Sequence, residues 1–321
     1  MGFDRNAASD QAFGHKPVLL EECLTALNIK PDGIYVDGTL GRAGHSLEIV
    51  KKLTGKGRLI CLDRDETAIE AAKVRLADYL DRVTLVHSNF SRIAEVLHEL
   101  DIPGVDGMLF DLGVSSPQLD EARRGFSYMH DAPLDMRMDR TAALTARDVV
   151  NDWSYEDLRR ILFEYGEERY APAIAKAIVR RRQEAAIETT GQLVDIIRAA
   201  MPPAALREKQ HPAKRSFQAI RIAVNDELGE LPPMLQAASD ALRPGGRLAV
   251  ISFHSLEDRI IKKTLQELST GCTCPPNFPV CVCGKKPKMK LVGRKPIVAG
   301  EAELVYNPRA RSAKLRVAEK L

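Results

Sequence analysis

Residues 36–45, which read VDGTLGRAGH, decide the fold of this chain. They connect a short apolar run, which predicts a β-strand, to a segment with helical spacing. Glycines at a strand-to-helix corner let the backbone approach a ligand closely, and open α/β folds bind their ligands at this edge of the sheet. The segment therefore predicts a ligand site at the end of the first strand.

The acid that ends the next predicted strand indicates the kind of ligand. Asp63 follows Gly44 by 19 residues, and an acid in that position can accept hydrogen bonds from both hydroxyls of a ribose. A dinucleotide such as NAD requires the spacing G-x-G-x-x-G to hold its pyrophosphate. Here the glycines follow G-x-x-G-x-x-G, and Asp37 precedes them. This pattern favours the cationic S-adenosylmethionine (SAM) over NAD, and a tight turn without a ligand stays open.

Apolar runs rich in β-branched residues predict the rest of the sheet. They occupy residues 33–37, 58–63, 83–87, 107–111 and 247–253. Helical patterns separate the first four runs, and continuous apolar runs are typical of parallel strands covered on both faces, so we expect a parallel sheet with crossover helices.

Two later runs, 290–298 and 314–318, are expected to close this sheet as an antiparallel pair. Pro244-Gly245-Gly246 predicts a turn before the run 247–253. Ser255 and Asp258 predict the N-terminal cap of a helix over 256–268.

Amphipathic helical patterns without strand runs fill the middle of the chain. We therefore expect an inserted helical domain at residues 119–214, carried by an α/β domain made of residues 1–118 and 215–321. A length of 321 residues is also typical of about two domains.

Composition narrows the class of protein. Apolar residues make up 45% and charged residues 28% of the chain, as in an ordinary globular protein. The polar first fourteen residues lack a secretory pattern, and no apolar run approaches the ~18 residues of a membrane span. We expect a cytoplasmic protein with no membrane contact and with reduced cysteines. The sequence gives no oligomeric state.

Positive charge is concentrated at the C-terminal end. Residues 259–321 contain 14 lysines and arginines against 4 acids, although the whole chain carries only +3. Such a segment is typical of proteins that bind a phosphate-rich partner, and a solvated basic surface is the alternative.

The fourth predicted strand ends in residues 111–118, DLGVSSPQ, beside the ligand corner. Amino methyltransferases of the N4 type carry a short Asp/Asn/Ser-Pro-Pro-aromatic loop at this place. Ser116-Pro117 resembles half of that loop, but Gln118 replaces the second proline. Phe126 and Tyr128 are the nearest aromatic residues, either for stacking on a flipped base or for ordinary packing.

With these motifs in order, the chain resembles the RsmH (MraW) family of SAM-dependent methyltransferases of small-subunit rRNA. The resemblance rests on motifs spread over nearly the whole chain, at residues 15–20, 37–45, 111–118, 124–129, 133–139, 165–169, 252–259 and 307–312. It implies a class I (Rossmann-like) methyltransferase fold with an inserted all-helical domain. It also implies methylation of N4 of a decoding-centre cytidine in 16S rRNA, within the small ribosomal subunit.

The resemblance also assigns roles to individual residues. The residues that would line the SAM site are Ala43, Gly44, His45, Asp63, Phe90, Asp111 and Gln118. Phe90 would cover the adenine. The candidate catalytic residues are Asp111, Ser116 and His254.

A cytosine amino nitrogen is a weak nucleophile, so acceptors for its hydrogens and alignment with the methyl carbon are needed. Carbonyls of residues 115–117 would accept, and Asp111 or His254 would take the proton. Two alternatives remain: Asp111 only orients the cofactor, or the proton is lost to water. A non-catalytic RNA-binding protein on this scaffold and an NAD-dependent oxidoreductase remain as alternative functions.

Four cysteines near the C-terminal end predict either a zinc site or a basic loop without metal. They are Cys272, Cys274, Cys281 and Cys283, spaced as two C-x-C pairs. Cys23 and Cys61 lie in apolar runs and are expected to be core thiols.

Overall fold

The computed structural model describes residues 16–274, 280 and 283–321. The chain forms two compact units, residues 1–113 with 228–321 and residues 114–227. The expected insertion, 119–214, lies inside the second unit. That unit also includes α12 (Lys214–Asn225), because Phe217 and Ile220 of this helix are buried in the helical core.

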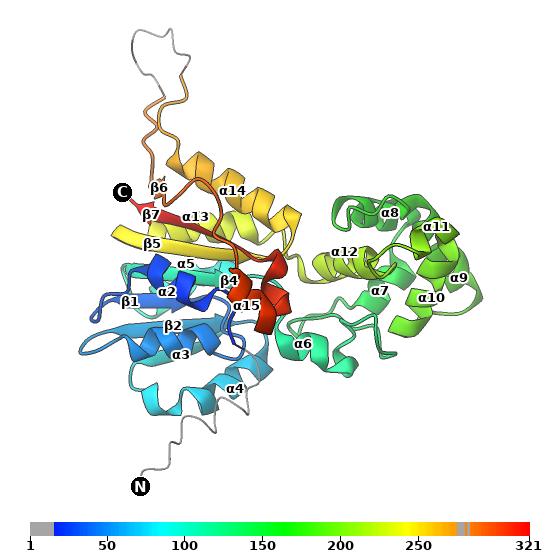
Figure 1. Cartoon of the computed structure of the whole chain (residues 1–321), viewed down its shortest axis with the longest axis horizontal. Coiled ribbons are helices and arrows are strands. Elements are labelled where there is room, and N and C mark those ends of the chain that lie inside the picture. Colours follow the sequence, from blue (N-terminus) through cyan, green and yellow to red (C-terminus); the bar gives the residue numbers. More distant parts are fainter. Residues whose placement is uncertain (1–15, 275–279, 281–282) are drawn as a thin grey trace. The chain divides into compact units, whose positions relative to one another are not determined.

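The first unit is built on a seven-stranded sheet (Figure 1), whose strand order is β3-β2-β1-β4-β5-β7-β6. The strands are β1 (Ile34–Asp37), β2 (Arg58–Asp63), β3 (Val83–His87), β4 (Val105–Asp111), β5 (Leu242–Ser252), β6 (Met289–Leu291) and β7 (Lys314–Lys320). β1 to β5 pair in parallel, whereas β7 runs antiparallel to both of its neighbours. The sheet confirms the class I methyltransferase fold and the antiparallel closing pair expected from the sequence.

Helices cover both faces of this sheet. On one face lie α2 (Leu20–Leu27), α3 (Gly44–Lys51) and α4 (Glu66–Arg75). On the other lie α5 (Ile93–Glu99), α13 (Leu231–Ala241) and α14 (Ser255–Ser269).

Successive residues of β2 point to opposite faces, so Leu59 and Cys61 join one core and Ile60 and Leu62 the other. This double burial explains the continuous apolar runs in the sequence. Cys23 and Cys61 are buried, which confirms them as core thiols.

The strand register brings the carboxyl ends of three strands to one edge. Asp37 of β1 pairs with Cys61 of β2 and with Leu109 of β4. Asp63 lies two residues after Cys61, and Asp111 lies two residues after Leu109, so the predicted acidic residues share this edge. Ligands of open α/β sheets bind there.

Two local predictions from the sequence are wrong. The segment Pro244-Gly245-Gly246 is not a turn before the strand but lies inside β5, where Gly245 has a φ of 77° and the pairing with β4 shifts between Val105 and Gly107. Glycine tolerates that left-handed conformation, so the strand continues through an irregularity. The N-terminal cap of α14 is His254 rather than Ser255, with Glu257 as the acid three residues on.

The second unit is helical. Its helices are α6 (Ser116–Asp120), α7 (Ala146–Asp152), α8 (Tyr155–Glu164), α9 (Ala171–Glu184), α10 (Thr190–Ala200), α11 (Pro203–Leu206) and α12. Leu158, Ile161 and Ile174 belong to its core. The buried Arg124 guanidinium donates hydrogen bonds to the carbonyls of Arg137 and Met138, which fixes the irregular segment 124–139. Among the described helices, none is long and apolar enough to cross a membrane.

Candidate cofactor site

The corner after β1 is held by a buried carboxylate. Asp37 is 1% exposed; its Oδ1 accepts a hydrogen bond from the Thr39 N–H at 3.2 Å, and its Oδ2 accepts one from the Ser46 hydroxyl at 2.6 Å. Burial raises the pKa of Asp37 to about 6. Because both oxygens accept hydrogen bonds from groups of the corner itself, Asp37 fixes the loop.

The backbone of the corner requires small residues. A methyl group on Gly38 would overlap the buried ring of Phe110, and one on Gly44 would lie 2.5 Å from Pro17 Cγ. Gly41 and Ala43 have φ values of 50° and 57°, in the left-handed region. The chain can thereby stay close to the sheet edge, where the backbone borders the candidate site.

Asp63 is oriented by two backbone groups. Its Oδ2 accepts a hydrogen bond from the Gly41 N–H and its Oδ1 accepts one from the Asp65 N–H, both at 2.8 Å. Burial raises the pKa of Asp63, although these two hydrogen bonds oppose the shift. Each carboxylate oxygen has a second lone pair. A fixed, partly exposed carboxylate with unused acceptor capacity fits the two hydroxyls of a ribose.

Phe90 contributes an apolar ring. It opens the short 3₁₀ helix η2 (Phe90–Arg92) after β3 and packs edge-on against Phe110, with ring centroids 6.1 Å apart. The Arg64 guanidinium lies 5.9 Å from the Phe90 centroid. Phe90 is 7% exposed, so it borders the core.

Asp111 has a buried carboxylate oxygen at this edge without a hydrogen-bond partner in the described part of the chain. Among the described residues nothing forms a hydrogen bond with its buried Oδ1, and its Oδ2 lies 3.8 Å from His45 Nδ1. Burial, reinforced by the Asp37 and Glu257 carboxylates, raises the pKa of Asp111 to about 8. An unpartnered buried acid attracts a cation or a proton donor.

His45 is a neutral buried side chain. Its Nε2 lies 3.0 Å from the Val18 carbonyl oxygen, and burial lowers the pKa of His45 to about 4. The ring therefore does not neutralise Asp111 at neutral pH.

Two corner residues were missed by the sequence analysis. The Thr39 hydroxyl oxygen accepts a hydrogen bond from the Asp111 N–H at 2.5 Å, which ties the end of β4 to the corner. Ser46 holds Asp37 and lies 3.3 Å from Cys61 Sγ. In the sequence, the one indication of these roles is that both hydroxyl residues lie in or beside a glycine-rich segment. Their hydrogen-bond partners become apparent only once the strand order is known.

His254 has a structural task. Its Nδ1 accepts a hydrogen bond from the Glu257 N–H at 3.4 Å, as the cap of α14. Its Nε2 lies 3.2 Å from Glu257 Oε1 at ion-pair distance without hydrogen-bond alignment. Glu257 Oε2 in turn accepts from the Phe253 and His254 N–H groups.

Ser116 and Gln118 belong to the helical unit, whereas the other predicted SAM-site and catalytic residues belong to the first unit. Ser116 begins α6, and the Gln118 side-chain oxygen accepts a hydrogen bond from the Ser115 N–H at 3.0 Å in a capping box. The carbonyls of Ser115 and Pro117 accept from the N–H groups of Leu119 and Glu121.

The aromatic candidates of the helical unit are packed. Phe126 is buried in the helical core. Tyr128 stacks on His211 with centroids 4.5 Å apart and meets Phe217 edge-on. This geometry favours ordinary packing over stacking on a base.

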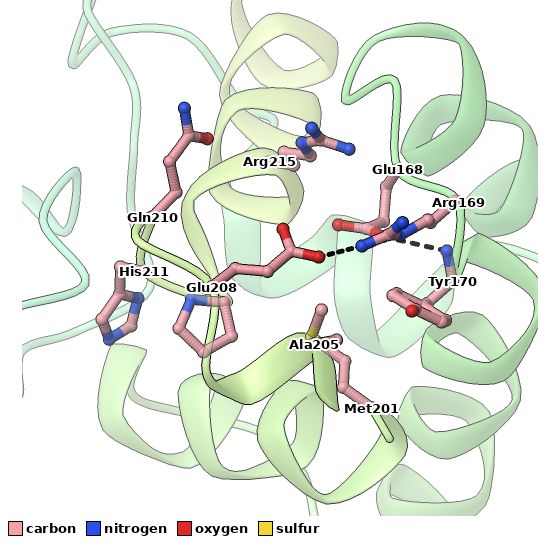
Figure 2. A pocket seen from close by; sticks show the side chains of 10 residues that line it. Glu168, Arg169, Tyr170, Met201, Ala205, Glu208, Gln210, His211 and Arg215 are labelled. Carbon is pink, nitrogen blue, oxygen red and sulfur yellow. Dashed lines mark hydrogen bonds and ion pairs between the residues drawn. The ribbon is translucent and has the colours of Figure 1, made fainter. Parts of the chain in front are cut away.

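A small pocket in the helical unit lies beside the motif 165–169. Figure 2 shows its side chains: Arg169 forms an ion pair with Glu208, and the Tyr170 N–H donates a hydrogen bond to the buried Glu168. Arg215, which also lines the pocket, donates a hydrogen bond to the Glu167 carbonyl. These charged groups have partners within the protein, so we assign the pocket no ligand.

The thiols of Cys272, Cys274 and Cys283 gather in the first unit, within 4.8 Å of one another. Cys281, the remaining predicted ligand, lies outside the described residues.

Comparison with known proteins supplies the family. The model of the MraW methylase family matches residues 12–321. The ribosomal RNA small subunit methyltransferase H of Paenibacillus sp. (strain JDR-2) is 60% identical over 315 residues, covering 96% of this chain and 100% of that protein. The enzyme of the same name from Symbiobacterium thermophilum is 58% identical, covering 97% and 98%.

A solved SAM-dependent O-methyltransferase from Thermotoga maritima shares 12% identity at a TM-score of 0.41, over 98% of this chain and 69% of that one. The fold assignment rests instead on the strand order. The sequence family decides between the two cofactors in favour of SAM, and this chain belongs to the MraW methylase family.

Proposed function

We propose that this protein transfers a methyl group from SAM to N4 of a decoding-centre cytidine in 16S rRNA. The relatives named as small-subunit rRNA methyltransferases support the rRNA substrate. The observation that carries the chemistry is the buried Oδ1 of Asp111 at the carboxyl edge of the sheet, which has no hydrogen-bond partner among residues 16–274, 280 and 283–321. An rRNA substrate supports a cytoplasmic location and the small ribosomal subunit as partner.

The residues of the corner fit SAM. The Asp63 carboxylate is held with acceptor capacity toward the ribose. Phe90 offers an apolar ring for the adenine, and the backbone at Gly41 and Ala43 comes close to the ligand. The ammonium and sulfonium charges of a bound cofactor would favour the ionised form of Asp111 and lower its raised pKa, and Asp37 adds negative potential from behind the loop.

SAM, when bound, supplies an electrophilic methyl group on a sulfonium. The protein must make the cytosine amino nitrogen nucleophilic, because its lone pair is delocalised into the ring. An acceptor that takes an amino hydrogen localises that pair. Asp111 can take this proton only when it is ionised, a form that the positive charge of a bound sulfonium would favour by lowering the raised pKa of Asp111.

The geometry favours Asp111 over His254 as proton acceptor. The Nδ1 lone pair of His254 already accepts a hydrogen bond as the cap of α14. The remaining ring nitrogen then carries the hydrogen and faces the Glu257 carboxylate. We therefore assign His254 the role of positioning α14.

The test is nucleoside mass analysis of 16S rRNA. Small subunits from cells lacking the protein are incubated with SAM and either the wild-type protein or Asp111→Asn. We expect N4-methylcytidine with the wild type only. Methylation of another atom or another RNA would overturn the proposal.

A calorimetric titration separates the alternatives. We expect S-adenosylhomocysteine to bind and NADH not to bind. Binding of the homocysteine compound without any methyl transfer to particles or naked rRNA would instead indicate a non-catalytic scaffold.

A further inference from the structure

The two ends of the segment 270–288, which connects α14 to β6, are tied together, and we call this segment the hairpin. The Lys288 N–H donates a hydrogen bond to the Leu268 carbonyl at 2.8 Å, and the Lys288 ammonium pairs with Asp240 at 2.8 Å. The described residues of the hairpin contain no helix or strand. Irregular loops longer than about 12–15 residues are uncommon in compact domains, and those that occur are usually functional or disordered.

Three thiols converge inside the described part of this hairpin. The sulfur atoms of Cys272, Cys274 and Cys283 lie within 4.8 Å of one another, and those of Cys272 and Cys283 are 3.7 Å apart. Zinc–sulfur bonds of about 2.3 Å in a tetrahedron separate neighbouring sulfur atoms by about 3.8 Å. The Cys274 N–H also donates a hydrogen bond to the Cys272 sulfur at 3.4 Å, an interaction that stabilises a thiolate.

We propose that Cys272, Cys274 and Cys283 bind a structural zinc ion. Each thiol loses its proton to solvent as its sulfur–zinc bond forms, and no electron is transferred. Thiolates are ligands that zinc prefers, and reduced cysteines are expected in this chain. Cys281 lies outside the described residues, and the proposal does not depend on it.

The position of the cluster indicates a structural metal. α14 begins at the carboxyl edge, directly after β5, and runs back along the sheet, as Figure 1 shows. A helix of its length is about 22 Å long, so the hairpin leaves from the opposite end. The metal orders the hairpin and fixes where the exposed Lys285 and Lys286 point.

The first experiment is elemental analysis of the full chain, purified under reducing conditions without chelator. We expect about one zinc per chain. Cobalt added to the metal-free protein should produce the intense visible bands of tetrahedral thiolate coordination. Neither measurement depends on methyl transfer, so the proposed function is not at stake.

Variants locate the site. Cys272→Ser and Cys283→Ser should each lose most of the zinc and the cobalt bands, whereas the control Cys23→Ala, at a buried core thiol, should keep both. Circular dichroism checks that all variants fold. Much less than one zinc after reconstitution, iron with acid-labile sulfide, a disulfide in the reduced preparation, or full metal content in both serine variants would each overturn the proposal.

Discussion

The corner after β1 and the hairpin 270–288 are both irregular segments, yet they are ordered in different ways. In the corner, Asp37 and Asp63 accept hydrogen bonds from nearby N–H groups, and Phe110 packs against Gly38. The described hairpin residues are mostly exposed, and three of them carry clustered thiols. A buried corner is ordered by the protein's own groups, because hydrogen bonds away from water are strong. An exposed loop without a core needs another constraint, and a metal supplies one.

The largest effect is expected for Asp111→Asn. This variant replaces the carboxylate at the end of β4 by an amide of nearly the same shape. Asparagine cannot take the amino proton, so kcat for rRNA methylation should fall about 10²- to 10⁴-fold. His254→Asn is the matched control, because asparagine also caps helices and kcat should stay near the wild-type value. A kcat close to wild type in Asp111→Asn, with weaker cofactor binding, would leave Asp111 an orienting role only.

Asp63→Ala tests the binding function of the same corner. The loss of two charge-assisted hydrogen bonds to a ribose should weaken S-adenosylhomocysteine binding by about 2–3 kcal/mol. Glu70→Ala, on the exposed side of α4, is the control and should bind normally. Calorimetry measures both affinities, and an unchanged value for Asp63→Ala would remove this residue from the site.

Gly38→Ala tests whether packing orders the corner. The new methyl group would overlap the Phe110 ring, and overpacking costs about 1–3 kcal/mol of unfolding free energy. Gly300→Ala meets no atom within 4 Å and should change stability little. Chemical denaturation of both variants compares them. If Gly38→Ala and Gly300→Ala have the same free energy of unfolding, the residues around Gly38 can shift to accommodate the methyl group.

The raised pKa of Asp111 makes stability depend on pH. The folded protein holds this proton up to about pH 8, whereas an unfolded aspartate loses it near its ordinary value of 3.8. Unfolding therefore releases a proton between these values, and stability falls as pH rises, by at most about 1.4 kcal/mol per pH unit.

His45, with its pKa lowered to about 4, acts in the opposite direction, but only below its ordinary value of 6.5. Asp37, with a pKa of about 6, is already mostly ionised at pH 6.5. Melting temperatures between pH 6.5 and 8 should thus decline less in Asp111→Asn than in the wild type. Parallel declines would show that Asp111 titrates normally.

The smallest effect concerns the hairpin. If the exposed Lys285 and Lys286 contact RNA phosphates, replacing either by alanine should make RNA binding less sensitive to salt. The slope of the logarithm of the binding constant against the logarithm of the salt concentration should become shallower by about 0.7 for each lysine. Lys288 is paired with Asp240, so Lys288→Ala should change the slope less. Binding titrations at several salt concentrations measure the slopes. A slope unchanged in all three would make these lysines solvated surface.

Much of the fold was predictable because strands buried on both faces leave an unmistakable pattern. The runs that became β1 to β4 were located to within two residues of the observed bounds. The Pro-Gly-Gly segment was wrongly predicted to be a turn, because β5 continues through a local irregularity there. Only the pairing of β5 with β4 makes that irregularity stable. The cap of α14 was placed one residue late, because histidine is not among the usual capping residues.

The sequence by itself determined the α/β class, the corner with its acid at Asp63, the family and the cluster of cysteines. The tertiary structure decided which polar atoms are already satisfied. Asp37, Gln118 and His254 have partners within their own segments, whereas Asp111 Oδ1 has none among the described residues. A residue's type shows that it can accept a hydrogen bond. Only its neighbours in space, brought together from distant strands, show whether that capacity is already used.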